Sequence, residues 1–175
     1  LSDAAFIPFQ EQGSLLRFSF LARLNRKGFI FARWNDPKLG IITTHLLSNY
    51  HERFDAGPYA VWQERQIDQL VDFIAGQDPA LPLLVVGDFN VPPWTSAYRR
   101  FQAAGLVDAM AGCERPSMTP KKDLDLGWLA PGLPERIDYV WYRLKNPLCA
   151  VRCGYAFEKE GLSDHMGLLA ELEFT

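Results

Sequence analysis

The chain has 175 residues, 48% of them hydrophobic and 22% charged, which fits one folded domain over residues 1–175 and excludes a disordered or collagen-like chain. The formal net charge of −3 argues against a protein that holds a long nucleic acid, because such proteins carry a basic surplus. It does not exclude an enzyme that neutralises one phosphate with a bound metal ion.

The first half of the chain predicts two strands followed by a helix. Runs of β-branched and aromatic residues predict strands over Gly28–Trp34 and Gly40–Leu46. A helix is predicted over Pro58–Ala75, where apolar residues such as Leu70 and Ile74 recur at helical spacing. A proline suits its first turn, and a glycine follows its end.

The second half is mostly strands. Leu83–Gly87 is apolar on both faces, as is typical of a central strand. A short helix is predicted from Thr95 or Ser96 to Ala104, with a hydroxyl cap. Further strands are predicted over Arg136–Arg143, Leu148–Phe157 and Leu168–Phe174. The elements together predict a layered α/β protein with mixed or mostly antiparallel sheets.

The three cysteines do not predict a disulfide framework, because an odd number cannot pair completely. Cys149 and Cys153 lie four positions apart on one predicted strand, which places them roughly 13 Å from each other and too far to bridge. We therefore interpret these two and Cys113 as ordinary buried thiols. The pattern does not indicate a compartment.

Polar residues directly follow two of the predicted strands, where a sheet can hold a site at its rim. Asp88 and Asn90 come straight after Leu83–Gly87. A carboxylate and an amide in this place can orient a water molecule and donate to a phosphoryl oxygen, although the same residues also favour plain turns. His45 lies near the end of the second predicted strand. It is either a donor to a phosphate oxygen or a histidine of the core.

Two further patterns combine a carboxylate with an imidazole. Asp138 interrupts an apolar strand, where aspartate is disfavoured and needs a partner if it is buried. An imidazole is a suitable partner, because a carboxylate hydrogen-bonded to a histidine fixes the tautomer of that histidine. The alternative is that Asp138 is exposed on the solvent face of the sheet. Asp164 and His165 precede the last predicted strand. This pair can bind a metal and transfer a proton, or it can simply form a turn.

Taken in chain order, these motifs resemble the endonuclease/exonuclease/phosphatase superfamily; they are Thr43-Thr44-His45-Leu46, Gly87-Asp88-Phe89-Asn90, Arg136-Ile137-Asp138-Tyr139-Val140 and Ser163-Asp164-His165. The resemblance implies a DNase I-like, four-layer α/β/β/α sandwich with two central sheets. It also implies attack of water on a phosphate ester with the help of Mg²⁺, or of Mn²⁺ or another divalent cation.

The resemblance implies a role for each polar residue. His165 is expected to be the general base that activates water, and Asp138 its orienting partner. Asp88 and Asn90 are expected to position the nucleophile and the phosphate. Asn90 and His45 are expected to bind the substrate through its phosphate oxygens.

The set of metal ligands that the resemblance implies is incomplete in this sequence. Asp164 is expected to be a ligand or outer-sphere partner of the metal. The superfamily also needs an early Asn and a Glu, often in a Gln-Glu pair. Gln10-Glu11 offers such a pair, but Phe6-Ile7-Pro8-Phe9 before it carries a proline. We therefore expect a sandwich that is incomplete at the N-terminus, and a chain that alone binds Mg²⁺ poorly and turns over little or no substrate.

Further residues resemble the neutral sphingomyelinase branch, whose members cleave sphingomyelin or related phospholipids on the headgroup side. They include Lys27-Gly28, His45-Leu46-Leu47-Ser48-Asn49-Tyr50, Arg65-Gln66 and Leu162-Ser163-Asp164-His165. A phospholipid substrate is therefore expected, and no stable complex with nucleic acid. A nuclease, a sugar or inositol phosphatase, and a non-catalytic binding module are the alternatives.

Two expectations concern partners. The apolar stretch 123–134, which includes Trp128, is expected to fold onto the core or, alternatively, to dip into a membrane surface. A sandwich that lacks its early strands leaves apolar sheet surface or an open edge. We therefore expect a homodimer or a partner chain to cover it.

Overall fold

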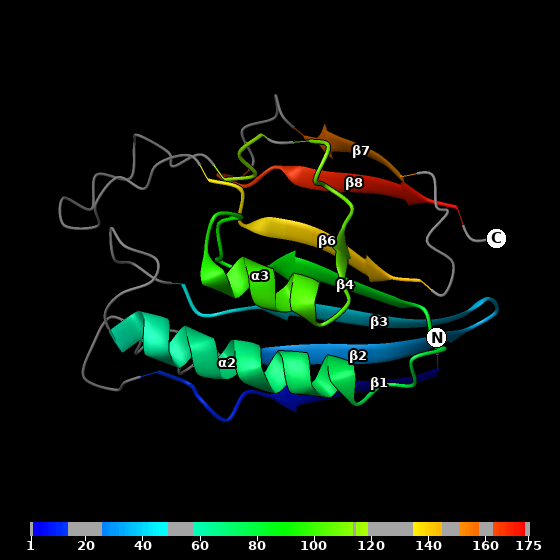
Figure 1. Cartoon of the computed structure of the whole chain (residues 1–175), viewed down its shortest axis with the longest axis horizontal. Helices are drawn as coiled ribbons and strands as arrows, with labels where there is room; N and C mark the ends of the chain where they lie inside the picture. The colour runs from blue at the N-terminus through cyan, green and yellow to red at the C-terminus, as the bar shows by residue number, and fades with distance from the viewer. Residues whose placement is uncertain are drawn as a thin grey trace.

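The computed structural model describes residues 2–13, 26–48, 58–113, 115–118, 135–144, 151–157 and 163–173. Within these ranges the chain forms a six-stranded sheet in the order β1-β2-β3-β4-β6-β5 and a two-stranded sheet of β7 and β8 (Figure 1). The strands are β1 (Ser2–Pro8), β2 (Gly28–Asn35), β3 (Lys38–His45), β4 (Leu83–Asp88), β5 (Val107–Asp108), β6 (Asp138–Arg143), β7 (Val151–Ala156) and β8 (Gly167–Leu172). The helices are α2 (Pro58–Ala75) and α3 (Ser96–Ala103).

The six-stranded sheet is mixed and the two-stranded sheet is antiparallel, in agreement with the prediction of mixed or mostly antiparallel sheets. β3 and β4 run parallel, whereas the other strand pairs are antiparallel. β4 lies between β3 and β6, which agrees with its apolar residues on both faces. The predicted hydroxyl cap of α3 is also present, because the backbone N–H of Tyr98 donates to Oγ1 of Thr95 at 3.3 Å.

Two strands were not predicted. β1 carries a proline, but Pro8 lies at the end of an edge strand opposite Gly28, where a missing N–H is tolerated. A register shift between Ser2 and Ala5, with Asp3 at φ 58°, disturbs the alternation that would have marked this strand. β5 has only two residues and leaves no periodic signal.

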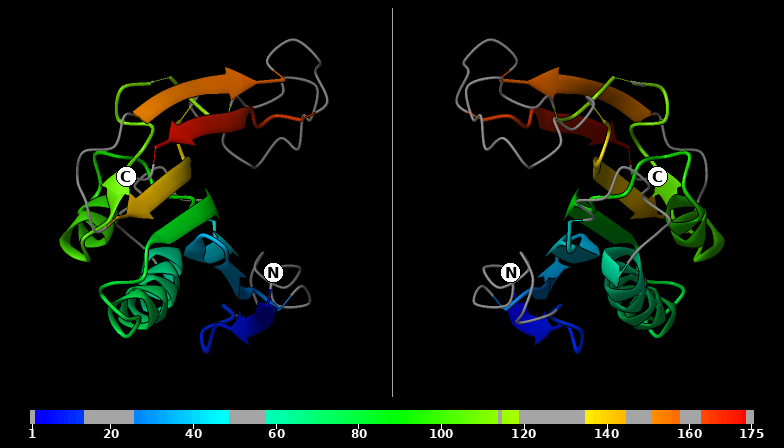
Figure 2. Two further views of the ribbon diagram at one scale, coloured as in Figure 1. Left: turned by 90° about the vertical axis from the view of Figure 1, so that its right-hand side faces the viewer. Right: turned by 90° about the vertical axis from the view of Figure 1, so that its left-hand side faces the viewer.

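Both helices pack on one face of the six-stranded sheet, as Figure 2 shows. Phe29, Val85 and Trp141 point into this core, where they meet Leu70 of α2 and Phe101 of α3. Successive side chains of a strand point to opposite faces. The alternate residues of the same strands therefore lie on the face away from the helices.

This second face is partly open. Phe6 of β1 and its cross-strand partner Ile30 of β2 are 53% and 43% exposed, and Trp34 is also exposed. Large apolar side chains gathered on one sheet face are a surface that proteins usually cover. None of the helices in the described part of the chain is long and apolar enough to cross a membrane.

The interpretation of all three cysteines as thiols is wrong. Cys113 and Cys153 form a disulfide, with a Cα–Cα distance of 6.3 Å. The bridge joins the segment after β5 to β7, which lies 40 residues further along the chain. Spacing within one strand could not reveal this pairing. Cys149 and the stretch 123–134 with Trp128 lie outside the described residues, so the expectations about them stay predictions.

Candidate active site

Three of the predicted site residues form a row across neighbouring strands. His45 at the end of β3 lies opposite Asp88 at the end of β4, and Asp88 lies opposite Asp138 at the start of β6. All three side chains lie on the face away from the helices. Each residue is an odd number of positions along its own strand from a residue that points into the core, and successive side chains of a strand alternate between faces. Strand register alone therefore brings these side chains together.

His165 reaches the same place from outside the six-stranded sheet. It precedes β8 and forms an isolated bridge with Met118. Its Nδ1 lies 2.8 Å from Oδ2 of Asp138, and Nε2 of His45 lies 3.5 Å from Oδ2 of Asp88. One donor atom from each of Asp88, Asp138 and His165 falls within 4.8 Å of the other two. The predicted gathering of a histidine with two carboxylates is present.

The turn after β4 is built by two unusual backbone conformations. Gly87 has φ 135°, and a Cβ there would collide with the backbone of Thr44. Asn90 has φ 51°, which asparagine tolerates better than most residues. The backbone N–H of Asn90 donates to Oδ1 of Asp88 at 2.8 Å.

The side chain of Asn90 is buried and turned toward the end of β3. Its Nδ2 donates to the carbonyl oxygen of Leu46 at 3.2 Å, and its Oδ1 accepts from the hydroxyl of Ser48 at 2.9 Å. From helix α2, Gln63 donates to the carbonyl oxygens of Leu47 and Asn90 at 2.7 and 2.9 Å. The predicted phosphate-binding amide therefore also holds the end of β3 against the turn after β4.

The ionised form of Asp88 is disfavoured in the folded protein. Burial, and after it the neighbouring carboxylate of Asp138, raise the pKa of Asp88 from 3.8 to about 6. The hydrogen bond with Asp138 raises the pKa of His165 above 6.5. Partial burial lowers the pKa of His45, and the cations of Lys27 and His165 act in the same direction, although 63% of the His45 side chain is exposed. His45 is therefore neutral at neutral pH.

Lys27 is a site residue that the motif search did not place. Its Nζ donates to the carbonyl oxygens of Leu46 at 2.7 Å and His45 at 3.4 Å. Burial lowers its pKa from 10.5 to about 8, while the charge of Asp88 acts the other way. The only sequence signal was the Lys27-Gly28 step before a strand, which carries no catalytic pattern of its own.

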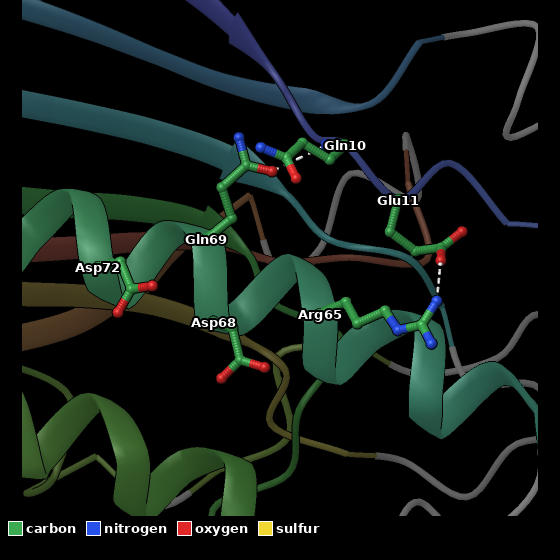
Figure 3. A pocket seen from close by; sticks show the side chains of 6 residues that line it. All are labelled: Gln10, Glu11, Arg65, Asp68, Gln69 and Asp72. Carbon is green, nitrogen blue, oxygen red and sulfur yellow. Dashed lines mark hydrogen bonds and ion pairs between the residues drawn. The ribbon is translucent and has the colours of Figure 1, made fainter.

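Two acidic residues considered for the metal do not belong to this group of donor atoms. Asp164 is exposed, and its carboxylate is not in the group of donor atoms that Asp88, Asp138 and His165 form. Glu11 pairs with Arg65 at 3.0 Å. Glu11 and Arg65 line a polar cavity of about 460 Å³ beside α2 (Figure 3), and none of the predicted site residues lines it.

The donor set fits a hard divalent cation. The cluster offers carboxylate oxygens from Asp88 and Asp138, the ligand type that Mg²⁺ prefers. Burial, and after it the charge of Asp138, disfavour the ionised form of Asp88, and a bound cation would favour that form again.

A carboxylate–imidazole centre at the rim of a mixed sheet, with helices on its other face, defines the class of DNase I-like α/β domains. Residues 8–165 match the model of the Endonuclease/Exonuclease/phosphatase family, so the chain belongs to this family. The predicted fold is confirmed in its incomplete form: a six-stranded and a two-stranded sheet with two helices among the described residues. No curated protein matches the chain.

Solved structures share this fold at low identity. An endonuclease/exonuclease/phosphatase from Beutenbergia cavernae has a TM-score of 0.69 at 18% identity, over 99% of this chain and 45% of that chain. Sphingomyelinase C from Streptomyces griseocarneus has a TM-score of 0.67 at 19% identity, over 97% and 63%. A 3′ phosphatase from Neisseria bound to a product DNA hairpin has a TM-score of 0.67 at 17% identity, over 99% and 71%. The chain thus spans about half to two thirds of the first two.

Proposed function

We propose that this chain carries the catalytic residues of a divalent-metal-dependent phosphodiesterase, which hydrolyses the headgroup linkage of a sphingomyelin-like phospholipid by attack of water on phosphorus. The observation that carries this proposal is the contact of 2.8 Å between His165 and Asp138, with Asp88 in the same cluster. Family membership supports phosphoester hydrolysis in general. The lipid substrate rests on the branch resemblance and on the net charge of −3.

His165 is the general base in this proposal. Its Nδ1 faces the carboxylate of Asp138, so Nδ1 carries the hydrogen and Nε2 keeps the lone pair that accepts a proton from water. The carboxylate of Asp138 orients the ring and stabilises the imidazolium that results. The raised pKa of His165 has this same cause.

The other residues of the cluster hold the cation or bind the phosphate in this proposal. Asp88 and Asp138 would hold the cation, with Asp164 as an outer-sphere partner, and the bound ion would neutralise charge on the phosphoryl oxygens. His45, neutral and 63% exposed, offers an N–H donor to a phosphate oxygen. Asn90 fixes Asp88 through its backbone N–H and is the second proposed donor to phosphate.

A substrate comparison tests this proposal. The full-length protein with Mg²⁺ is assayed in parallel on sphingomyelin vesicles, plasmid DNA and inositol phosphates. We expect release of the phosphorylated headgroup from sphingomyelin and no nicking of the plasmid. Plasmid cleavage without lipid hydrolysis would assign a nuclease, and activity on none of the three would favour a binding module. Glu171→Gln, an exposed change on β8, is the matched control and should leave hydrolysis unchanged.

A further inference from the structure

Ser117 belongs to none of the motifs, yet its hydroxyl contacts the proposed catalytic pair. The residue is fully buried, at 0% exposure. Its Oγ donates to Oδ2 of Asp138 at 2.7 Å. The same oxygen accepts the backbone N–H groups of Ile137 and Asp138, at 3.0 Å each.

These contacts fix the direction of the hydroxyl hydrogen. A serine hydroxyl has one hydrogen and two lone pairs. Because two backbone N–H groups occupy the acceptor side, the hydrogen is directed to the carboxylate of Asp138. Oδ2 of Asp138 therefore accepts from Ser117 at 2.7 Å and faces Nδ1 of His165 at 2.8 Å. A carboxylate oxygen held in this way cannot rotate freely away from the imidazole.

The backbone around Ser117 also holds the segment of His165. The carbonyl oxygen of Ser117 accepts from the N–H of Met166 at 2.7 Å, and both Ser117 and Met118 donate to the carbonyl oxygen of Glu135 at 3.0 Å. Met118 forms the isolated bridge with His165. One short segment thus contacts the chain on both sides of the Asp138–His165 pair.

This segment is itself anchored at its start. Cys113 is bonded to Cys153 of β7. The hydroxyl of Tyr155 contacts the carbonyl oxygens of Cys113 and Arg115, at 2.7 Å each. The guanidinium of Arg115 lies 5.0 Å from the centroid of the Tyr155 ring. Ser117 therefore projects from a segment that is fastened to the second sheet.

We propose that Ser117 is a positioning residue: its hydroxyl holds Asp138 in the rotamer that fixes His165 in the Nδ1–H tautomer, with Nε2 left to accept the proton of water. This inference deepens the proposed function and rests on it for its catalytic meaning. The tautomer, however, is a property of the folded chain and is measurable without any substrate.

The test is imidazole ¹⁵N NMR of the 175-residue chain, at a pH where His165 is neutral. Wild type and Ser117→Thr, which keeps the hydroxyl, should show His165 as a single Nδ1–H tautomer. Ser117→Ala should show a mixture of the two tautomers. A single Nδ1–H tautomer in Ser117→Ala, with the fold intact by circular dichroism, would overturn the inference. Should Ser117→Ala not fold, the near-isosteric Ser117→Cys replaces it under the same criterion.

Kinetics of the full-length protein separate this inference from the proposed function. Outer-shell residues of this kind typically contribute about 10–100-fold. We expect kcat of Ser117→Ala to fall by that factor while KM is unchanged, and Ser117→Thr to recover it. Hydrolysis that is undiminished in Ser117→Ala contradicts the positioning role alone. A protein that hydrolyses no phosphoester contradicts the proposed function, while the tautomer measurement still decides the role of Ser117.

Discussion

At the scale of single residues, the electrostatics of the site oppose the stability of the chain without metal. The pKa of Asp88 is raised to about 6 by burial and by the nearby carboxylate of Asp138. Ionised Asp88 is therefore less favourable in the folded protein than in the unfolded chain. Without a bound cation, the ionised carboxylate of Asp88 therefore lowers the stability of the folded chain.

Replacement of Asp88 by asparagine should stabilise the chain in the absence of metal, and only above a defined pH. The free-energy penalty of ionising Asp88 is small below about pH 3.8, the pKa in the unfolded chain, and nearly complete above about pH 6, the pKa in the folded chain. A rise in the pKa of Asp88 from 3.8 to about 6 corresponds to about 3 kcal/mol at 1.36 kcal/mol per pKa unit. Urea unfolding of wild type and Asp88→Asn at pH 3.5 and 7.5 checks this. An equal difference at both pH values would refute the explanation.

His45, Asp88 and Asp138 were predicted as site residues because each interrupts or ends an apolar strand. His45, Asp88 and Asp138 meet through strand register, and a register row of this kind follows from the order of the strands. Ser117 was not predicted, and Lys27 was named only for its resemblance to the branch, because a serine in a loop and a lysine before a strand are ordinary residues in a sequence. Their roles depend on tertiary hydrogen bonds that no periodicity encodes.

At the scale of elements, prediction succeeded where one periodic pattern dominates. Helix α2 covers Pro58–Ala75, because its apolar stripe, starting proline and closing glycine agree with one another. Prediction from the sequence failed where the structure depends on contacts between residues far apart in the chain. β1 depends on an edge position that tolerates Pro8, and the Cys113–Cys153 disulfide depends on two segments that only the folded chain brings together.

The disulfide should contribute measurably to stability. It closes a loop between residues that are 40 positions apart, for which the loop-entropy relation gives about 4 kcal/mol. Cys153→Ser should lower the free energy of unfolding by an amount up to this value, as measured by urea denaturation without reductant.

A thiol titration of the denatured, unreduced wild-type protein is the companion measurement. It should find one free thiol per chain, because two of the three cysteines are bonded. Three free thiols would show that the bond is not formed, and the stability difference should then vanish as well.

At the scale of the whole molecule, the six-stranded sheet has one face covered by helices and one face that is partly open. Phe6 and Ile30 are 53% and 43% exposed on the open face. We propose that a second copy or a partner chain covers this surface, because exposed apolar patches favour association. The chain spans 45% of the Beutenbergia cavernae structure that it matches.

Self-association of the chain should therefore depend on this face. Sedimentation velocity should show dimers that increase with protein concentration, and the double variant Phe6→Gln, Ile30→Gln should shift the protein toward monomer. Val107→Gln, which removes another exposed apolar residue on the far edge strand β5, is the control and should leave the distribution unchanged. A wild-type chain that stays monomeric at every concentration would contradict the homodimer and leave a partner chain as the cover of this face.

In the proposed function, the pair of His165 and Asp138 activates water for attack on phosphorus. The most direct measurement is hydrolysis of sphingomyelin by the full-length protein with Mg²⁺ in ¹⁸O-labelled water, for wild type and His165→Gln. We predict that one ¹⁸O enters the released phosphorylated headgroup, and that His165→Gln lowers kcat by about 10²–10⁴-fold, the usual contribution of a general base. Undiminished turnover by His165→Gln, or ¹⁸O found only in the lipid product, would contradict the account.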